Sequence, residues 1–299
     1  MSTSYKNIQV IINPAAGQPE PILNTLNRVF QKHEVHWDTS VILQHGDGEK
    51  WARAAVAAGV DLVASYGGDG TAVDVANGLV GTDIPQMVLP GGTANALAQE
   101  LNIPLNLEAA AEVIFNSEVR KIDLGKTGDR YFMLRADMGV SAQIVDEASR
   151  EMKDRFGVLA YGINALRAVT RNDRALYTLT LDGEVVEVEG TACLIANANK
   201  LGTLELTLSP QVDMTDGLLN VFVFNNLAES LLSAAAEIIN LQDGAATTLQ
   251  HWQVKEVSIK ADPPQEVRGD GEVLGETPLT ITIAPQAMSV LVPRASQEG

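Results

Sequence analysis

Short apolar runs alternate with stretches of helical periodicity through the first 120 residues, and this alternation constrains the fold more than any other feature of the chain. The apolar runs lie at 8–12, 37–43, 62–66 and 86–89, and a segment with helical spacing follows each of them. Strands that alternate with helices indicate βαβ units and a largely parallel sheet. We therefore predict an open parallel α/β sheet for this part of the chain.

Beyond about residue 121 the pattern changes to closely spaced β signals with short turns. The clearest is the alternating segment 177–188, in which Asp182-Gly183 favours a two-residue hairpin turn. Further strands are expected at 130–138, 191–197, 218–223, 254–260 and 279–283, and helices at 142–153, 158–169 and 228–241.

The change of pattern predicts two domains packed around a cleft. The first is an α/β domain over 1–125, with the C-terminal segment 285–299 as a candidate addition, and the second is a β-rich sandwich over 126–284. In the apolar stripe of the helix at 228–241 we see either a lip that admits a lipid chain or, as the default, a cover for the core. Lys153 and Arg155 are interpreted as solvated surface charge.

Charge and composition exclude several classes of function. The chain has 38 acidic and 21 basic residues, a formal charge of −17, so it lacks the basic surface that nucleic-acid binding requires. No apolar run approaches the roughly 20 residues that span a bilayer, and the N-terminus shows no secretory signal, so a cytoplasmic protein is expected. The single cysteine, Cys193, excludes a disulfide framework, and the four histidines lack zinc-ligand spacing. Any metal site should therefore use oxygen ligands, which favours Mg²⁺ or Ca²⁺.

Three glycine-containing loops follow three of the predicted strands: 13–17, 67–71 and 90–95. Ligands bind at the carboxyl ends of strands in open α/β sheets, and helix N-termini with exposed amides favour phosphate. Each loop alone is interpreted as a turn, but the three together favour a nucleotide site. Asp69 would add a carboxylate suited to a magnesium-bound nucleotide. The alternative for Asp69 is a helix cap.

These motifs, in this order and spacing, resemble the diacylglycerol kinase catalytic family, which includes bacterial lipid kinases and the sphingosine and ceramide kinases. The glycine motifs are shared with NAD kinases and phosphofructokinases, whereas the later motifs are specific to the lipid kinases. The later matches are Tyr161, the hairpin near Asp182, Ile195-Ala196-Asn197, Ser209-Pro210, Asp216-Gly217-Leu218-Leu219, and Asp270-Gly271-Glu272 followed by Pro278.

The resemblance implies a two-domain enzyme with ATP on the N-terminal domain and catalysis in the cleft. Asp270 would be the general base for a lipid hydroxyl, while Asp69 and Glu272, which are also acidic members of the catalytic set, would hold Mg²⁺. Asp216 falls in a loop that can hold a structural Mg²⁺, and a turn aspartate is the equal alternative. The nucleotide contacts would fall on Asn13, Gly67, Gly68, Gly70, Thr71, Gly91, Gly92, Thr93 and Asn95.

The Asp-Gly-Glu tripeptide occurs twice, at 182–184 and 270–272. The first lies within strict alternation and is predicted to be a hairpin turn. The second could also be only a turn, but Arg268-Gly269 precedes it, so we expect an irregular loop there. With the family resemblance, this context places catalysis on the second tripeptide.

Two positions depart from the family pattern. Ala96 follows Asn95 where many bacterial diacylglycerol kinases have an aspartate, and this run is closer to the sphingoid-lipid kinases. A magnesium-organising carboxylate is thus absent, which weakens the transfer of the metal network and of diacylglycerol as substrate. The glycine-rich stretch that the family has near 200–204 is reduced to Gly202.

The leading expectation is an ATP-dependent kinase that transfers the γ-phosphate to a diacylglycerol-like or sphingoid-like lipid hydroxyl. The lipid substrate would lie in a membrane, so we expect a cytoplasmic protein that also associates peripherally with the inner membrane surface. A homodimer is one candidate assembly. The alternatives are a kinase of a soluble substrate such as NAD, and a catalytically weak nucleotide- or lipid-binding regulator.

Overall fold

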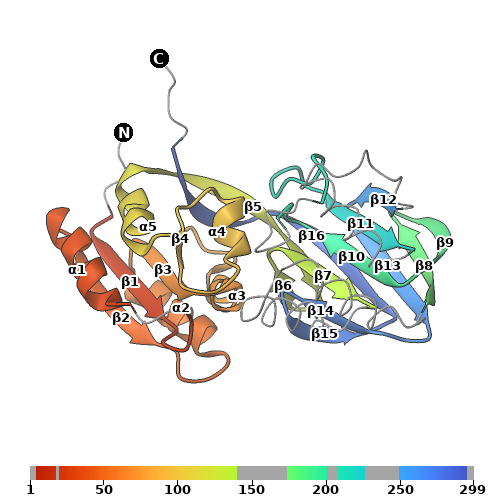
Figure 1. Ribbon diagram of the computed structural model, residues 1–299, viewed down its shortest axis with the longest axis horizontal. Coiled ribbons are helices and arrows are strands. Elements are labelled where there is room, and N and C mark those ends of the chain that lie inside the picture. The colour runs from red at the N-terminus through yellow and green to blue at the C-terminus, as the bar shows by residue number, and fades with distance from the viewer. Residues whose placement is uncertain (1–4, 18–19, 140–173, 201–207, 226–248, 295–299) are drawn as a thin grey trace, which may run out of the picture. The chain divides into compact units, whose positions relative to one another are not determined.

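The computed structural model describes residues 5–17, 20–139, 174–200, 208–225 and 249–294 (Figure 1). The chain forms two compact units: unit 1 comprises Met1–Leu124, Ala198–Gly217 and Ala284–Gly299, and unit 2 comprises Gly125–Asn197 and Leu218–Ile283. Residues 198–217 thus group with unit 1, whereas sequence analysis assigns them to the second domain. The helices expected at 142–153, 158–169 and 228–241, with Lys153, Arg155, Tyr161 and Gly202, lie outside the described residues.

Unit 1 is built on a parallel sheet with the strand order β2-β1-β3-β4-β16. Strands β3 and β4 are buried along their whole length, as expected for central strands of a sheet that is covered on both faces. Its elements are β1 (Asn7–Ile12), α1 (Ile22–Lys32), β2 (His36–Val41), α2 (Asp47–Ala58), β3 (Leu62–Gly67), α3 (Asp69–Leu79), β4 (Gln86–Pro90), α4 (Ala96–Glu100), α5 (Leu107–Val113), the 3₁₀ turn η1 (Ile114–Asn116) and parts of β5 (Ser117–Thr127) and β16 (Leu279–Pro293).

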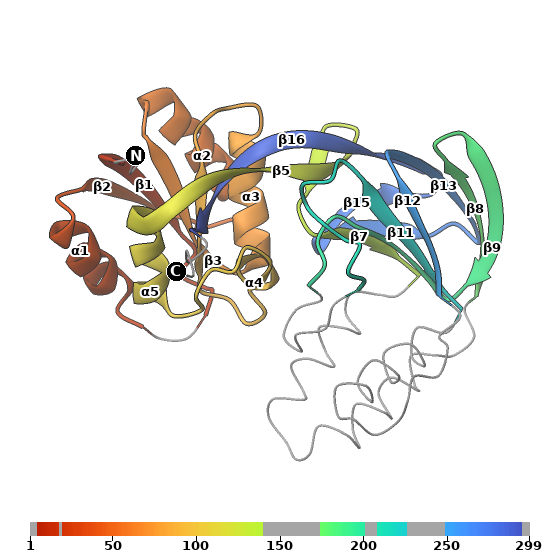
Figure 2. The ribbon, with the colours of Figure 1, turned by 90° about the horizontal axis from the view of Figure 1, so that it is seen from above.

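The helices cover the sheet of unit 1 in two pairs. Helix α1 packs with α5, and α2 packs with α3. Figure 2 shows the two pairs on opposite faces of this sheet. Helix α1 buries Leu26, Val29 and Phe30, a spacing of three and one residues that places one apolar stripe against the sheet. Among the described residues, no helix is long and apolar enough to cross a membrane.

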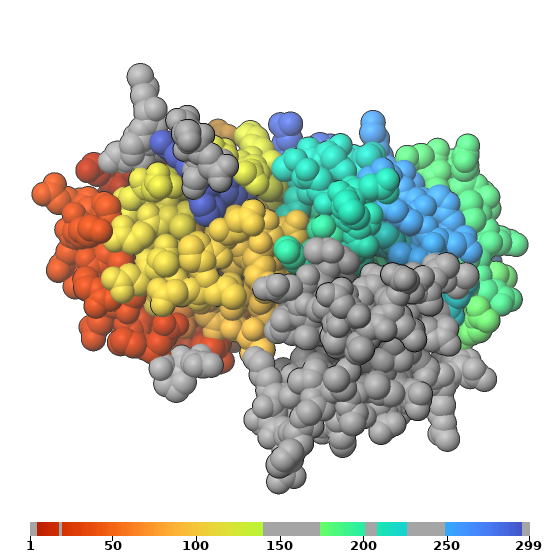
Figure 3. Space-filling model, turned by 45° about the horizontal axis from the view of Figure 1, so that its top comes forward, coloured from red at the N-terminus to blue at the C-terminus, as the bar shows by residue number. Residues whose placement is uncertain are grey.

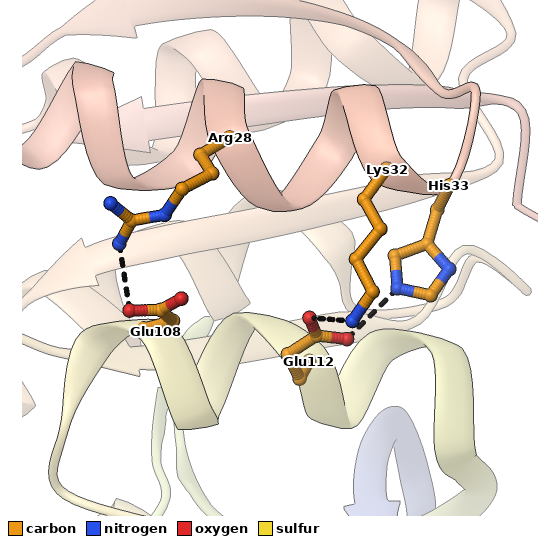
Figure 4. A network of polar contacts seen from close by, with 5 residues as sticks. All are labelled: Arg28, Lys32, His33, Glu108 and Glu112. Atoms are coloured by element: carbon orange, nitrogen blue, oxygen red, sulfur yellow. Dashed lines mark hydrogen bonds and ion pairs between the residues drawn. The ribbon is translucent and has the colours of Figure 1, made fainter.

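Ion pairs join the outer surfaces of α1 and α5 (Figure 4). Arg28 pairs with Glu108 at 2.7 Å, and both Lys32 and His33 contact Glu112 at 2.8 Å. Burial raises the pKa of Glu112, but the hydrogen bonds from Lys32 and His33 outweigh it, so the pKa lies below its usual value. The red surface of α1 adjoins the yellow surface of α5 in Figure 3. Exposed pairs of this kind contribute about 0–1 kcal/mol each, so the buried stripe of α1 provides most of the packing energy.

Unit 2 contains two antiparallel layers. One has the order β16-β13-β8-β9, and the other is a six-stranded sheet with the order β12-β11-β10-β7-β14-β15. Buried side chains from both layers, such as Tyr177, Val221 and Ile259, form one apolar core. The strands of unit 2, besides parts of β5 and β16, are β6 (Arg130–Phe132), β7 (Arg135–Met138), β8 (Ala175–Leu181), β9 (Glu184–Gly190), β10 (Ala192–Ala196), β11 (Leu219–Phe224), β12 (Leu249–Val254), β13 (Glu256–Asp262), β14 (Glu266–Gly269) and β15 (Glu272–Glu276).

The predicted fold class is confirmed: a parallel α/β sheet in the N-terminal part and a β-rich sandwich in the C-terminal part. The strand expected at 279–283 is longer than predicted, because β16 runs from Leu279 to Pro293. Two other predicted strands are interrupted. The strand expected at 130–138 is divided into β6 and β7, and the strand expected at 254–260 is divided between β12 and β13. In both cases the backbone N–H groups at the break donate to an aspartate carboxylate, which removes them from the strand ladder.

Candidate active site

The three glycine-containing loops follow three strands that are neighbours in the sheet of unit 1. The first loop (residues 13–17) follows β1, the second loop (67–71) begins at the end of β3, and the third loop (90–95) begins at the end of β4. Strand β3 pairs with both β1 and β4, and all three run parallel. The loops therefore lie at the same edge of the sheet, as the sequence predicts.

Hydrogen bonds hold the three loops together. The Asn13 N–H donates to the carbonyl oxygen of Tyr66 at 2.9 Å, and the Asn13 side-chain amide donates to Thr71 Oγ1 at 3.0 Å. The Gly91 N–H donates to the carbonyl oxygen of Gly67 at 2.8 Å. The second loop is thus bonded to both of its neighbours, so the loops form one constellation.

Two glycines of this constellation differ in the space available for a side chain. A Cβ on Gly92 would lie 2.5 Å from the Cα of Gly68, so the second and third loops can touch only because position 92 has no side chain. A Cβ on Gly70 would meet no atom within 4 Å. The glycine at 92 is therefore required by the protein itself, whereas packing does not require the one at 70.

Asp69 connects the starts of two helices. It is the first residue of α3, and its carboxylate accepts the N–H groups of Ala96 at 3.1 Å and Leu97 at 2.9 Å, at the start of α4. The capping role considered from the sequence thus applies to the following helix and not to its own. Because a carboxylate is favourable at a helix N-terminus, this contact fixes the third loop against the second.

Asn95 gives the third loop its shape. Its φ is +49°, and its side chain accepts the Gly92 N–H and donates to the Gly92 carbonyl oxygen, both at 2.9 Å. Thr93 lies between them and is exposed. Among the residues predicted to contact nucleotide, Asn95 therefore has a local structural role that the sequence did not indicate.

Magnesium ligands are not assembled by the protein alone. The described residues contain no group of three or more His, Cys, Asp or Glu side chains that could hold a metal ion. In the loop of Asp216 it is Asp213 that accepts the N–H and hydroxyl of Thr215, at 2.9 and 2.8 Å. Within the part of the chain that the structure describes, a cage of three or more such side chains is therefore not available to Mg²⁺. A nucleotide-bound ion that takes one protein carboxylate does fit, since each Asp69 oxygen uses one lone pair for an N–H group.

The two Asp-Gly-Glu tripeptides form the same kind of turn. Asp182-Gly183 joins β8 to β9, with φ of +48° and +96°, and Asp270-Gly271 joins β14 to β15, with φ of +49° and +92°. Gly269 pairs with Glu272 across the second turn. The irregular loop predicted at the second tripeptide is therefore wrong, because strand pairing extends up to both sides of a two-residue hairpin turn.

Asp270 holds the backbone of the segment that joins β6 to β7. Its carboxylate accepts the N–H groups of Met133 at 2.6 Å, Leu134 at 3.0 and 3.3 Å, and Arg135 at 2.9 Å. Three N–H groups make these four contacts, because that of Leu134 is shared between both oxygens, so about one of the roughly four lone-pair positions of the carboxylate is left. Burial raises the pKa of Asp270 to about 6, against the opposing effects of these donors and of the Arg135 charge.

Asp182 makes the corresponding contacts in another part of unit 2. Its carboxylate accepts the N–H groups of Lys255, at 3.0 and 3.1 Å, and of Glu256, at 2.8 Å. Asp182 is exposed, whereas Asp270 is partly buried. The difference between the two tripeptides is therefore their surroundings and not their turn geometry.

Asp123 is a buried carboxylate that the motif analysis missed. It is 1% exposed, and it accepts the N–H groups of Gly217 and Gln286 at 2.7 Å each. Its own N–H donates to the Met214 carbonyl oxygen at 2.7 Å. Asp123 thereby joins β5, the 208–217 segment and β16 within unit 1. The available signal was a charged residue inside the apolar run Ile122-Asp123-Leu124.

The fold and these motifs define a kinase-type chain with a parallel α/β unit and an antiparallel β-sandwich. The diacylglycerol kinase catalytic domain matches residues 7–127, and the YegS C-terminal NAD kinase beta sandwich-like domain matches residues 135–292. The chain belongs to the diacylglycerol kinase catalytic family.

Individual relatives agree with this family. A protein of Staphylococcus aureus named “Putative lipid kinase” is 32% identical over 78% of this chain and 77% of its own length. An uncharacterized protein of Synechocystis is 29% identical over 79% of this chain, which spans only 55% of that relative. The crystal structure of a “putative diacylglycerol kinase” from Bacillus anthracis superposes with a TM-score of 0.83 at 24% identity, covering 98% of this chain and 99% of that one, and supports the fold.

Proposed function

We propose that the protein is an ATP-dependent lipid kinase that transfers the γ-phosphate to a lipid hydroxyl. The observation that carries this proposal is the constellation of three loops, held together at the carboxyl ends of neighbouring parallel strands. Ligands of open α/β sheets bind at such an edge, and backbone N–H groups at helix starts suit phosphate oxygens. Membership of the diacylglycerol kinase catalytic family supports a lipid as the acceptor.

In this proposal the nucleotide phosphates approach the backbone of Gly68, Gly70 and Gly92, although the Gly92 N–H is already bonded to the Asn95 side chain. Asn13 and Thr71 line the same edge. Asp69 would be the protein carboxylate next to a nucleotide-bound Mg²⁺, an ion that neutralises charge on the triphosphate when bound. The protein itself keeps the loops in place, so that the phosphates meet oriented donors. Gly67, Gly91, Thr93 and Asn95 shape the loops or extend this surface.

We assign the acceptor chemistry to the second Asp-Gly-Glu turn. In phosphoryl transfer the acceptor hydroxyl loses its proton to a base as its oxygen attacks the γ-phosphorus, and ADP leaves. A carboxyl group with a pKa of about 6, as on Asp270, suits proton transfer near neutral pH, although its backbone contacts also give it a holding role. Glu272 follows at the start of β15 and is exposed. The two residues together are our proposed acidic pair, with Asp216 a separate proposed metal residue.

Position 96 bears on which kind of lipid is the acceptor. Ala96 is 2% exposed, and its N–H is the group that Asp69 caps. The buried alanine provides no carboxylate for a metal, and the resemblance of this run to the sphingoid-lipid kinases supports a sphingoid-like acceptor beside the diacylglycerol-like one. Access to such a lipid implies peripheral contact with a membrane surface.

A nucleotide on these loops should respond differently to alanine at Gly70 and at Gly92. Gly70→Ala meets no protein atom and typically stabilises a helical position by about 0.4–1 kcal/mol, yet it adds a methyl group where phosphate would approach. We expect the variant to keep or raise its melting temperature and to lose ATP affinity in calorimetry. Gly92→Ala should lose both affinity and stability, because its Cβ meets the Gly68 backbone. Unchanged ATP affinity in folded Gly70→Ala would refute the loop assignment.

A soluble acceptor such as NAD is the second candidate function. The observation in its favour is that the family domain matching residues 135–292 is itself described as NAD kinase beta sandwich-like. The same loops would bind ATP in either case, so only the identity of the phosphorylated product separates the two.

A further inference from the structure

Tyr66 directly precedes the second loop and contacts both the first and the third loop. It is fully buried in β3, directly before the second loop. Its ring lies under the third loop, since a Cβ on Gly91 would come within 2.6 Å of the ring carbon Cζ. A Cβ on Gly17, in the first loop, would lie 3.4 Å from its hydroxyl oxygen. One side chain thus fills the space beneath two loops.

The hydroxyl of Tyr66 also bonds Glu20, three residues beyond the first loop. It donates to Glu20 Oε1 at 2.6 Å, and Glu20 lies directly before the residue that caps α1. The near side of that loop is held by the Asn13 N–H on the Tyr66 carbonyl oxygen at 2.9 Å. Tyr66 therefore bonds the start of the first loop and a residue that follows this loop in the chain.

The chemistry of this contact favours the hydrogen bond. A buried tyrosine hydroxyl requires a partner, and a carboxylate acceptor gives a shorter and stronger bond than a neutral one. Burial, together with the hydrogen bond and charge of Glu20, raises the pKa of Tyr66, so the hydroxyl keeps its proton and remains the donor. The charge of Glu20 is not needed for the bond, because a neutral amide oxygen at that position can accept it as well.

We propose that the hydrogen bond from Tyr66 to Glu20 is a latch that positions the first and third loops for the nucleotide. Tyr66 and Glu20 are then positioning residues for ATP, acting through the loops. The inference rests on the proposed kinase function, which it deepens by adding two residues outside the glycine motifs.

The test compares ATP affinity in three variants of the full chain. Tyr66→Phe keeps the ring and removes the hydroxyl, and we expect its Kd for ATP in calorimetry to rise about tenfold, which is at the upper end of the range for one ordinary hydrogen bond. Glu20→Ala should match it. Glu20→Gln retains an acceptor oxygen for the Tyr66 hydroxyl, so its affinity should equal that of the wild type. Where turnover is measured, KM for ATP should rise while kcat changes less than about twofold, because the substitution weakens ATP binding and leaves the phosphoryl-transfer step unchanged.

Tyr177→Phe is the matched control. Tyr177 is also fully buried, and its hydroxyl donates to Gln265 Oε1 at 2.9 Å in unit 2. Both Tyr→Phe variants should lower the melting temperature, but only Tyr66→Phe should weaken ATP binding. Wild-type affinity in Tyr66→Phe, or equal weakening by Tyr177→Phe, would overturn the latch while leaving the proposed function intact. A wild-type protein that binds no ATP would overturn both.

Discussion

Asp69→Ala is expected to lower turnover by about 10²-fold or more, the loss typical of a misplaced catalytic constellation. The substitution leaves the N–H groups of Ala96 and Leu97 without their acceptor and releases the third loop from the second. ATP affinity, measured by calorimetry, should fall as well, while circular dichroism should show a folded protein. Because the structure assigns Asp69 a holding role, excess Mg²⁺ should restore little of the activity.

Asp74→Ala provides the matched control on the same helix. Asp74 also accepts an N–H group at the start of another helix, that of Gly48 in α2 at 2.9 Å. Both variants remove one aspartate of α3 from the start of another helix, so their losses of stability should be comparable. If Asp74→Ala lost as much turnover as Asp69→Ala, or if added Mg²⁺ fully restored Asp69→Ala, the holding role of Asp69 would be wrong.

Asp270→Asn should lower kcat by about 10²- to 10⁴-fold, the usual contribution of a positioned general base, with little change in ATP affinity. Its matched control is Asp182→Asn, since both aspartates occupy the same position of a hairpin turn and hold backbone N–H groups of another segment. An asparagine has one acceptor oxygen where the aspartate has two, so both variants lose backbone contacts. Only the loss of kcat should distinguish them.

The pH dependence of stability gives a second signature for Asp270. A carboxyl group whose folded-state pKa is raised contributes stability that is complete below its ordinary value of 3.8 and is lost as the pH rises through about 6. Asp270→Asn has no such group, so the difference in unfolding free energy between wild type and variant should change over this interval. Equal losses of kcat in both Asn variants would mean that Asp270 only holds the 133–135 backbone, and the catalytic assignment would fail.

Local sequence patterns were sufficient to predict the main strands and the convergence of the loops. Runs such as 62–66 are short, mostly apolar and directly followed by glycine, and their side chains are buried as that pattern requires. The three glycine motifs sit at strand ends, so a parallel sheet brings them to one edge whatever the details of packing. These inferences depend on periodicity, which is local in the sequence, and on a topology that parallel sheets share in general.

Contacts between distant residues could not be predicted in this way. Asp270 and the N–H group of Met133 are 137 positions apart, and Tyr66 and Glu20 are 46 apart. Nothing in the sequence around the two Asp-Gly-Glu tripeptides shows that one will be buried and the other exposed. The break between β6 and β7 has the same origin, because it depends on an acceptor, Asp270, that is distant in the sequence.

The most direct test of the central claim is a transfer assay with γ-labelled ATP, Mg²⁺ and a panel of extracted lipids, NAD and sugars, followed by separation of organic and aqueous products. We predict that the wild-type protein places the label in the organic phase on a lipid hydroxyl, and that Asp69→Ala does so at least about 10²-fold more slowly. Label on NAD or a sugar in the aqueous phase, or no transfer by the wild-type protein, would contradict the proposed lipid kinase.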